Sequence, residues 1–311
     1  MLRIMAPVAS YEGAKLQVQA GADEIYLGLD NPNFKNLNFS GRGKGANVST
    51  VKELKKIVKF CHENNVSVNY AANIPFMVDD FEDLFIEHVE LGVSSEVDGL
   101  ILGELGSILL VNEHNFDIPL IAGVFNNVFN VEHVKLLKNL GVSRVILPHK
   151  LTLNEMKEII NTIDDIEYEV FGHFGCSNIN GRCLLIHAWG ENVNLGLVCR
   201  AKYNVYANSA IHNNVCILDA GTDCTICSLH DLANIGVNVI KIVGRDKDPF
   251  FTSTITRVYR EFIDNIYSNK IKRTPVSLNR DKILKREPWW SYFCDDNRCK
   301  YRPNRVSRSY V

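Results

Sequence analysis

Cysteine is concentrated in one stretch of this 311-residue chain. Six of the nine cysteines lie in the window from Cys176 to Cys227, just after the run Glu169–Gly175. In chain order they are Cys176, Cys183, Cys199, Cys216, Cys224 and Cys227. Thiolates gathered in this way typically bind a metal, and four of them complete a four-thiolate site. The window therefore predicts a metal centre on Cys176, Cys183, Cys199 and either Cys224 or Cys227.

The spacing of the cysteines bears on which metal they bind. Iron–sulfur clusters and structural zinc both use four thiolates, so the number of ligands does not separate them. Zinc fingers and ribbons favour two tight C-x2-C pairs, and within the window only Cys224-x2-Cys227 has that spacing. The other intervals are long and uneven, which favours a [4Fe–4S] cluster over zinc. The alternative to any metal is a set of reduced cysteines buried in the core.

Composition is that of an ordinary soluble protein. Hydrophobic residues make up 46% of the chain and charged residues 23%, which suits a large core in one or two domains. No stretch approaches the roughly 18 apolar residues of a membrane span, and the start Met1–Pro7 does not read as a signal peptide. Clustered thiols also indicate a reducing compartment. We expect a cytoplasmic protein without a membrane span.

Positive charge is concentrated at the C-terminal end. The formal net charge is −2, but residues 270–311 carry twelve Lys and Arg against four Asp and Glu, which leaves −10 for the rest. Such a segment is suited to neutralise RNA phosphates, and packing against the acidic body is the alternative. It also contains Trp289-Trp290 and the pair Cys294-x4-Cys299. We expect an aromatic plug with buried cysteines there, with a second thiol site as the alternative.

Apolar runs alternate with amphipathic stretches along the chain. Helical periodicity is clear in the segments Thr50–Asn64, Asp80–Leu91, Glu132–Leu140 and Leu153–Thr162. Gly21, Gly92, Gly141 and Gly236 each precede a predicted strand, where a glycine can end a helix in the left-handed conformation. The eight predicted strands are Arg3–Ala6, Glu24–Gly28, Ser67–Ala71, Gly99–Leu102, Leu120–Val124, Arg144–Leu147, Glu167–Phe171 and Val239–Val243.

Repeated strand–helix units predict an α/β fold with a parallel sheet. Eight units favour a (β/α)8 TIM-barrel-like fold with a cysteine-rich insertion after the seventh strand, and a doubly wound open sheet is the alternative. We expect a barrel domain over residues 1–269, which includes an iron–sulfur insertion over residues 174–230. A basic C-terminal extension would follow over residues 270–311.

The barrel prediction also locates the chemistry, because TIM barrels gather reactive groups at the carboxyl ends of their strands. We expect His173 and Arg245 to line a substrate cavity beside the metal centre, with Asn127 and His149 as further catalytic candidates. Arg245 would bind an anionic group and His173 would transfer a proton. Bracing of the insertion is the structural alternative. Other polar groups at the predicted strand ends are Asp30, Asn73, Glu104, Asn126 and Lys150.

Several motifs of hydrolases and nucleotide-binding proteins are absent from the sequence. The chain has no H-E-x-x-H zinc motif and no G-x-S-x-G nucleophile motif. The glycine-rich run Gly41–Gly45 matches neither the P-loop nor the dinucleotide fingerprint. The sequence therefore carries no signature of a peptidase.

Several stretches together resemble the collagenase-like family known as peptidase family U32. The resemblance runs through most of residues 4–250. The paired cysteines and the last strand are specific in combination. The stretches that carry it are Ala6–Ser10, Ala20–Gly28, Leu140–Pro148, Glu169–Phe171 leading to Cys176 and Cys183, Cys199-Arg200 and Lys241–Arg245.

The resemblance implies a barrel with a [4Fe–4S] cluster on Cys176, Cys183, Cys199 and Cys224, so that Cys227 becomes a neighbour. It further implies hydroxylation without molecular oxygen, either of ribosomal or transfer RNA bases, with prephenate as a hydroxyl source, or of quinone precursors. We therefore expect an enzyme that modifies a small aromatic or prenylated molecule or an RNA base. The alternatives are a peptidase, which the family name suggests, and a non-catalytic, metal-stabilised protein that binds RNA or a partner subunit.

The chain also departs from the family pattern. The fifth strand of the family commonly ends H-x-S-T-Q, whereas here it reads Ile121–Phe125. The segment before Cys176 is one residue shorter than usual. Because the changed strand end removes polar groups from the expected site, it favours a small-molecule substrate over RNA.

Overall fold

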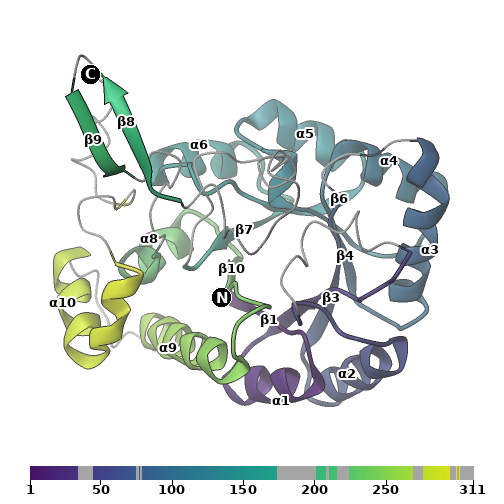
Figure 1. Cartoon of the computed structure of the whole chain (residues 1–311), viewed down its shortest axis with the longest axis horizontal. Coiled ribbons are helices and arrows are strands. Elements are labelled where there is room, and N and C mark those ends of the chain that lie inside the picture. Colours follow the sequence, from purple (N-terminus) through teal and green to yellow (C-terminus); the bar gives the residue numbers. More distant parts are fainter. Residues whose placement is uncertain are drawn as a thin grey trace.

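The structure is a closed parallel barrel surrounded by helices (Figure 1). This computed structural model describes residues 1–33, 45–74, 77, 79–173, 201–207, 210–215, 224–268, 276–294, 299 and 301. The barrel strands are adjacent in the order β1-β10-β7-β6-β5-β4-β3-β2. Their bounds are β1 (Arg3–Pro7), β2 (Glu24–Leu27), β3 (Ser67–Ala72), β4 (Gly99–Leu102), β5 (Leu120–Ala122), β6 (Val142–Ile146), β7 (Glu167–Phe171) and β10 (Val239–Lys241). The (β/α)8 prediction is confirmed, and each predicted strand overlaps an observed one.

The helices lie outside the barrel and cover its strands (Figure 1). They are α1 (Tyr11–Gln19), α2 (Val51–Glu63), α3 (Glu82–Val93), α4 (Leu105–Glu113), α5 (Val131–Asn139), α6 (Leu153–Thr162), α8 (Leu229–Asn234), α9 (Pro249–Tyr267) and α10 (Val276–Arg286). Short 3-10 turns are η2 (Asp79–Phe81), η3 (Val124–Asn126), η6 (Ile226–Ser228) and η7 (Pro288–Tyr292). Polar residues cap several of the helices, as Thr152 does for α6, where its side chain and that of Glu155 form a capping box.

Glycines end helices at three of the four predicted positions. Gly21, Gly141 and Gly236 have φ angles of 87°, 80° and 98°, in the left-handed region. Gly92 differs, because it lies inside α3 and packs on the barrel. A Cβ atom at Gly92 would lie 2.7 Å from Cδ1 of Tyr70, so this glycine allows close approach of helix and strand.

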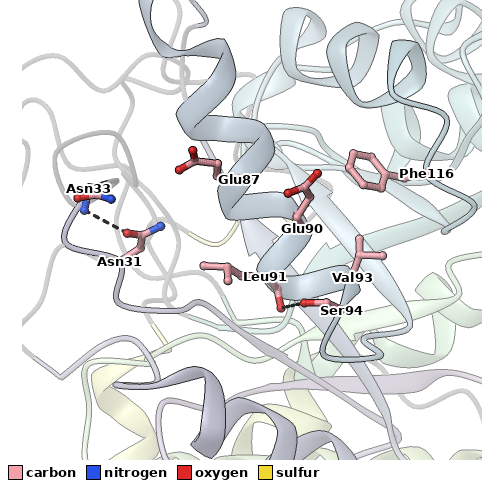
Figure 2. Close-up of a pocket in the computed structure, with 8 residues that line it drawn as sticks. All are labelled: Asn31, Asn33, Glu87, Glu90, Leu91, Val93, Ser94 and Phe116. Atoms are coloured by element: carbon pink, nitrogen blue, oxygen red, sulfur yellow. Dashed lines mark hydrogen bonds between the residues drawn. The ribbon is translucent and has the colours of Figure 1, made fainter.

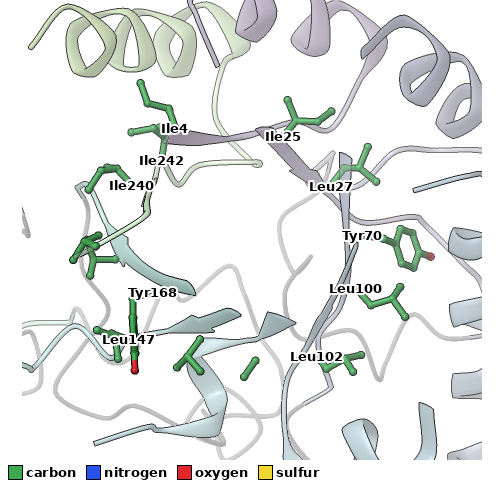
Figure 3. Packing of buried hydrophobic residues seen from close by; sticks show 14 of the residues in the cluster. Ile4, Ile25, Leu27, Tyr70, Leu100, Leu102, Leu147, Tyr168, Ile240 and Ile242 are labelled. Atoms are coloured by element: carbon green, nitrogen blue, oxygen red, sulfur yellow. The ribbon is translucent and has the colours of Figure 1, made fainter. Parts of the chain in front are cut away.

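Two hydrophobic layers hold the barrel together. The larger one lies between strands and helices, and it includes Ile4, Ile25, Tyr70 and Leu100 (Figure 3). The smaller one fills the barrel interior with Met5, Tyr26, Ile101, Ile121, Ile146, Phe171 and Val239. The interior is therefore a packed core, and substrate access is restricted to the ends of the barrel.

The region after β7 contains a separate antiparallel hairpin, which stands away from the barrel (Figure 1). Its strands are β8 (Tyr203–Ala207) and β9 (Ala210–Val215). The predicted ligands Cys176, Cys183 and Cys199, and also Cys216, lie outside the described residues. Among the described residues, no helix combines the length and the apolar character needed to cross a membrane.

The C-terminal helix α10 and the turn η7 pack against the barrel layer. Ile283, Trp290 and Phe293 are buried in the same hydrophobic cluster as the barrel strands, and Cys294 and Cys299 are partly buried against it. The aromatic residues Trp290 and Phe293 of the predicted plug are therefore buried, whereas its two cysteines are only partly buried.

Candidate functional site

Charged residues form a paired network inside the barrel, toward the amino-terminal ends of the strands. Arg144 donates through Nη1 and Nη2 to the two carboxylate oxygens of Glu24, at 2.7 and 3.0 Å. Its Nη1 atom also lies 3.3 Å from Glu169 Oε2. Lys241 Nζ donates to Glu169 Oε1 at 2.8 Å. Glu167 accepts from Arg3 and Arg144. Charges buried this deeply are stable when each has a partner, as here.

Lys241 and Arg245 are two positively charged side chains nearer the carboxyl end of the barrel. Lys241 Nζ lies 3.9 Å from the centroid of the Tyr26 ring, and the guanidinium carbon of Arg245 lies 5.5 Å from it. Burial lowers the pKa of both Lys241 and Arg245, and Glu169 opposes the shift at Lys241. Because Lys241 is paired with Glu169, the buried guanidinium of Arg245 is the group here that suits an anionic ligand.

Gly28, directly after β2, makes room for two polar groups. A Cβ atom at Gly28 would lie 2.5 Å from Asn47 Oδ1 and 2.7 Å from Arg245 Nη1. Asn47 itself is held by a hydrogen bond from its Nδ2 to Asp30 Oδ1, at 3.1 Å. The missing side chain of Gly28 therefore leaves the space into which both Asn47 and Arg245 extend.

Three asparagines at this end of the barrel have buried acceptor atoms without a partner. The Oδ1 atoms of Asn47, Asn73 and Asn126 receive no hydrogen bond from the residues that the structure describes. Asn126 is nonetheless fixed, since its Nδ2 donates to the carbonyls of Leu102 and Gly123 at 3.0 Å. Buried acceptors of this kind are suited to receive N–H or O–H groups of a ligand.

The remaining predicted strand-end residues have mixed roles. His149 is buried and stacks on Phe171, with ring centroids 3.8 Å apart. Asn127 takes a left-handed conformation after η3, and its Nδ2 donates to the Phe125 carbonyl at 3.2 Å. Glu104 caps α4. His149 thus covers the barrel interior, whereas the described contacts of Asn127 and Glu104 shape local structure.

His173 lies beside Cys224 at the end of β7. The two backbones form an isolated β-bridge, and the His173 ring packs edge-on against Phe293 at a centroid distance of 4.8 Å. Burial lowers the pKa of His173 to about 3, so its imidazole is neutral at physiological pH. Thr225, the residue after Cys224, donates from its backbone N–H and its hydroxyl to the Gly172 carbonyl, at 2.9 and 3.1 Å. These bonds fix Cys224 at the carboxyl end of β7.

One contact of Cys224 suits a metal-binding thiolate. Trp290 Nε1 donates to its Sγ at 3.2 Å. Burial raises the pKa of the Cys224 thiol to about 12, and the hydrogen bond from Trp290 opposes that shift. A metal would bind the deprotonated sulfur, and an N–H donor is a usual neighbour of such a sulfur. This residue therefore fits the predicted cluster.

The described residues alone do not complete a metal site. Among them, no group of three or more His, Cys, Asp or Glu side chains is close enough to hold a metal ion. Cys227, Cys294 and Cys299 are partly buried and form no disulfide with another described cysteine. Completing a four-thiolate site on Cys224 thus requires the predicted ligands outside the described part of the chain.

A surface pocket of about 660 Å³ lies between α3 and the segment after β2 (Figure 2). Its lining includes Asn31, Leu91 and Phe116 together with two carboxylates, those of Glu87 and Glu90. Two carboxylates at one opening repel a phosphate-rich ligand. We therefore do not assign RNA binding to this pocket.

Comparison with known proteins places the chain in a family. The model of peptidase family U32 matches residues 9–302. The chain belongs to peptidase family U32. The predicted resemblance is confirmed, and the match extends beyond residue 250 into the aromatic C-terminal segment.

The named relatives include a protease and two proteins whose names refer to hydroxylation of RNA. The chain is 28% identical to an uncharacterized protease of Methanocaldococcus jannaschii, over 99% of this chain and 80% of the relative. It is 26% identical to tRNA hydroxylation protein P of Helicobacter pylori, over 87% of this chain and 66% of the relative. It is also 26% identical to the 23S rRNA 5-hydroxycytidine synthase of Escherichia coli, over 86% of this chain but 40% of the relative.

Sequence reasoning missed several of these residues. Asn47 lies between predicted elements, in a segment where no pattern marked it. Glu169 and Lys241 lie within the predicted strands, and the signal that could have found them is a charge at an inward position of an otherwise apolar strand. The partner of each charge comes from a distant strand, which the sequence does not specify.

Proposed function

We propose that this U32 protein hydroxylates an RNA base without molecular oxygen, with a [4Fe–4S] cluster held by Cys176, Cys183, Cys199 and Cys224. The observation that carries the proposal is the meeting of Cys224 and His173 at the end of β7, on the barrel face that also holds Arg245 and Asn47. The names of two relatives, which act on tRNA and on 23S rRNA, support RNA as the substrate.

The residues at this face would divide the work by their chemistry. Arg245 would attract a phosphate or carboxylate through its buried guanidinium, whereas Lys241 is paired with Glu169. Asn47 and Asn126 accept hydrogen bonds from the donor groups of a base. His173, held neutral by burial, would order the Cys224 segment through its backbone bridge. The cluster, when bound, would supply one-electron chemistry.

A direct test compares RNA from cells that lack the protein with RNA from the same cells complemented by the wild type or by Cys224→Ala. Nucleosides from tRNA and rRNA are measured by mass spectrometry after anaerobic growth. We expect a nucleoside heavier by one oxygen atom in the wild-type complement alone. Identical nucleosides in all three samples would reject the RNA substrate.

The basic C-terminal segment offers a second test of the substrate class. Truncation after Tyr301 removes Arg302, Arg305 and Arg308, which lie outside the described residues. If these residues bind RNA, affinity for bulk tRNA should be lower in the truncated form and less sensitive to salt, because fewer counterions are released. Equally weak, salt-independent retention of both forms would favour a small aromatic or prenylated molecule.

A further inference from the structure

The turn η7 brings two adjacent tryptophans to the barrel, and they use their N–H groups differently. Trp289 Nε1 donates to the carboxylate of Glu287 at 2.7 Å. Trp290 Nε1 instead donates to Cys224 Sγ at 3.2 Å. A buried indole N–H needs an acceptor, and a carboxylate or carbonyl oxygen is the usual one. The choice of a sulfur acceptor by Trp290 therefore distinguishes it from its neighbour.

Both partners of this hydrogen bond are held in place. The Trp290 ring is fully buried and packs against Tyr259 and Phe293, with centroid distances of 5.8 and 5.3 Å. Its backbone N–H donates to the Glu287 carbonyl at 2.9 Å. Cys224 is fixed from the other side by its bridge to His173. The contact thus joins two buried elements that are 66 residues apart in the chain.

Packing alone does not explain why residue 290 is a tryptophan. Phenylalanine would fill most of the same space against Tyr259 and Phe293 without an N–H group. The donor becomes useful if Cys224 is a thiolate ligand, because hydrogen bonds to the sulfur ligands of a cluster offset negative charge and set its reduction potential.

We propose that Trp290 is a positioning residue of the cluster: its N–H group orients the Cys224 sulfur and stabilises the reduced state. The inference rests on the proposed function, since it requires that Cys224 binds the cluster. Reduction adds one electron to the cluster, and the nearby N–H dipole favours that added charge. Loss of the donor should therefore lower the reduction potential.

The test compares Trp290→Phe with its matched control Trp289→Phe in the full chain. Each protein is purified anaerobically and titrated with a reductant while the reduced cluster is followed by electron paramagnetic resonance. We expect the equilibrium constant for one-electron reduction to fall about tenfold in Trp290→Phe, which is about 59 mV, and to stay unchanged in Trp289→Phe. A cluster-containing Trp290→Phe with the wild-type potential would overturn the inference.

A second measurement keeps Trp290 intact, in case Trp290→Phe loses its iron. The chain has three tryptophans, so Trp189→Phe/Trp289→Phe leaves Trp290 as the single indole. Labelled with ¹⁵N-tryptophan, this protein should show a weak hyperfine coupling between the reduced cluster and the indole nitrogen in pulsed paramagnetic resonance. Absence of that coupling would reject the hydrogen bond. Absence of iron and sulfide from the wild type would instead reject the proposed function.

Discussion

Buried polar groups are ion-paired at one end of the barrel interior, whereas at the other end some have no described hydrogen-bond partner. Toward the amino-terminal ends of the strands, Glu24, Arg144 and Glu169 form direct ion pairs. At the carboxyl end, Asn47 and Asn126 have buried acceptor atoms that no described residue satisfies. An unsatisfied buried acceptor costs about 1–3 kcal/mol. The difference indicates that the first end serves stability and that the second is built for a ligand, as in other TIM barrels.

Removal of Arg144 should have the largest effect on stability. Arg144→Met would leave the buried carboxylate of Glu24 without its two-pronged partner and Glu169 with Lys241 alone. We expect the free energy of unfolding in urea to fall by about 3–5 kcal/mol. The control Lys135→Ala breaks an exposed pair with Glu132 and should cost at most about 0.5 kcal/mol. A loss at Arg144 as small as that of the control would contradict the structural role.

A methyl group at Gly28 should damage the carboxyl end and spare the fold. The Cβ atom of Gly28→Ala would displace Asn47 Oδ1 and Arg245 Nη1, because both lie within 2.7 Å of its position. Displacement of binding groups by roughly 1 Å costs about 100-fold in rate. We expect Gly28→Ala to lose about 100-fold in the rate of RNA hydroxylation and to keep the circular dichroism spectrum of the wild type. Full activity would show that neither group contacts the substrate.

Asn47→Ala should give a smaller change in the same direction. It removes the unsatisfied Oδ1 atom and the bond to the exposed Asp30. We expect kcat/KM to fall about tenfold, with a stability loss of about 1 kcal/mol or less. Asn139→Ala, at the exposed end of α5, is the control for both quantities. Unchanged kcat/KM would reject Asn47 as a ligand contact.

Acid should weaken the amino-terminal network through protonation of Glu167, and this is the smallest effect that we predict. Burial works to raise the pKa of Glu167, but hydrogen bonding from Arg3 and the charge of Arg144 outweigh it, so the net shift is downward. The folded state therefore binds the Glu167 proton less readily than the unfolded state. Its stabilising effect is present above the unfolded pKa and is lost as pH falls through the folded pKa.

The matching measurement is urea denaturation of the wild type and Glu167→Gln from pH 7 down to pH 3. Glu167 is partly exposed, so we expect Glu167→Gln to cost about 1 kcal/mol at neutral pH and the two proteins to converge in acid. A stability gap that persists at the lowest pH would show that charge is not the cause.

Much of the fold could be predicted from the sequence because its signals are local. Apolar runs such as Gly99–Leu102 mark strands directly, and Gly141 marks a helix end through its left-handed conformation. Gly92 misled the same reasoning, because its small size serves contact with Tyr70 rather than a turn.

The site was less predictable because its contacts join distant parts of the chain. The barrel prediction correctly placed Arg245 and His173 at strand ends, but it did not foresee that Arg245 and Asn47 both lie beside Gly28 or that His173 pairs with Cys224. No spacing indicated that Trp290 would donate to Cys224. Assignment of Cys176, Cys183 and Cys199 as ligands stays a prediction.

Iron and acid-labile sulfide, measured per chain after anaerobic purification, test the central claim most directly. We expect about four of each in the wild type. Cys224→Ala should lose most of both, whereas Cys227→Ala should keep them. A wild type that contains zinc or no metal, or a Cys224→Ala protein with full iron and sulfide, would contradict this account of the site.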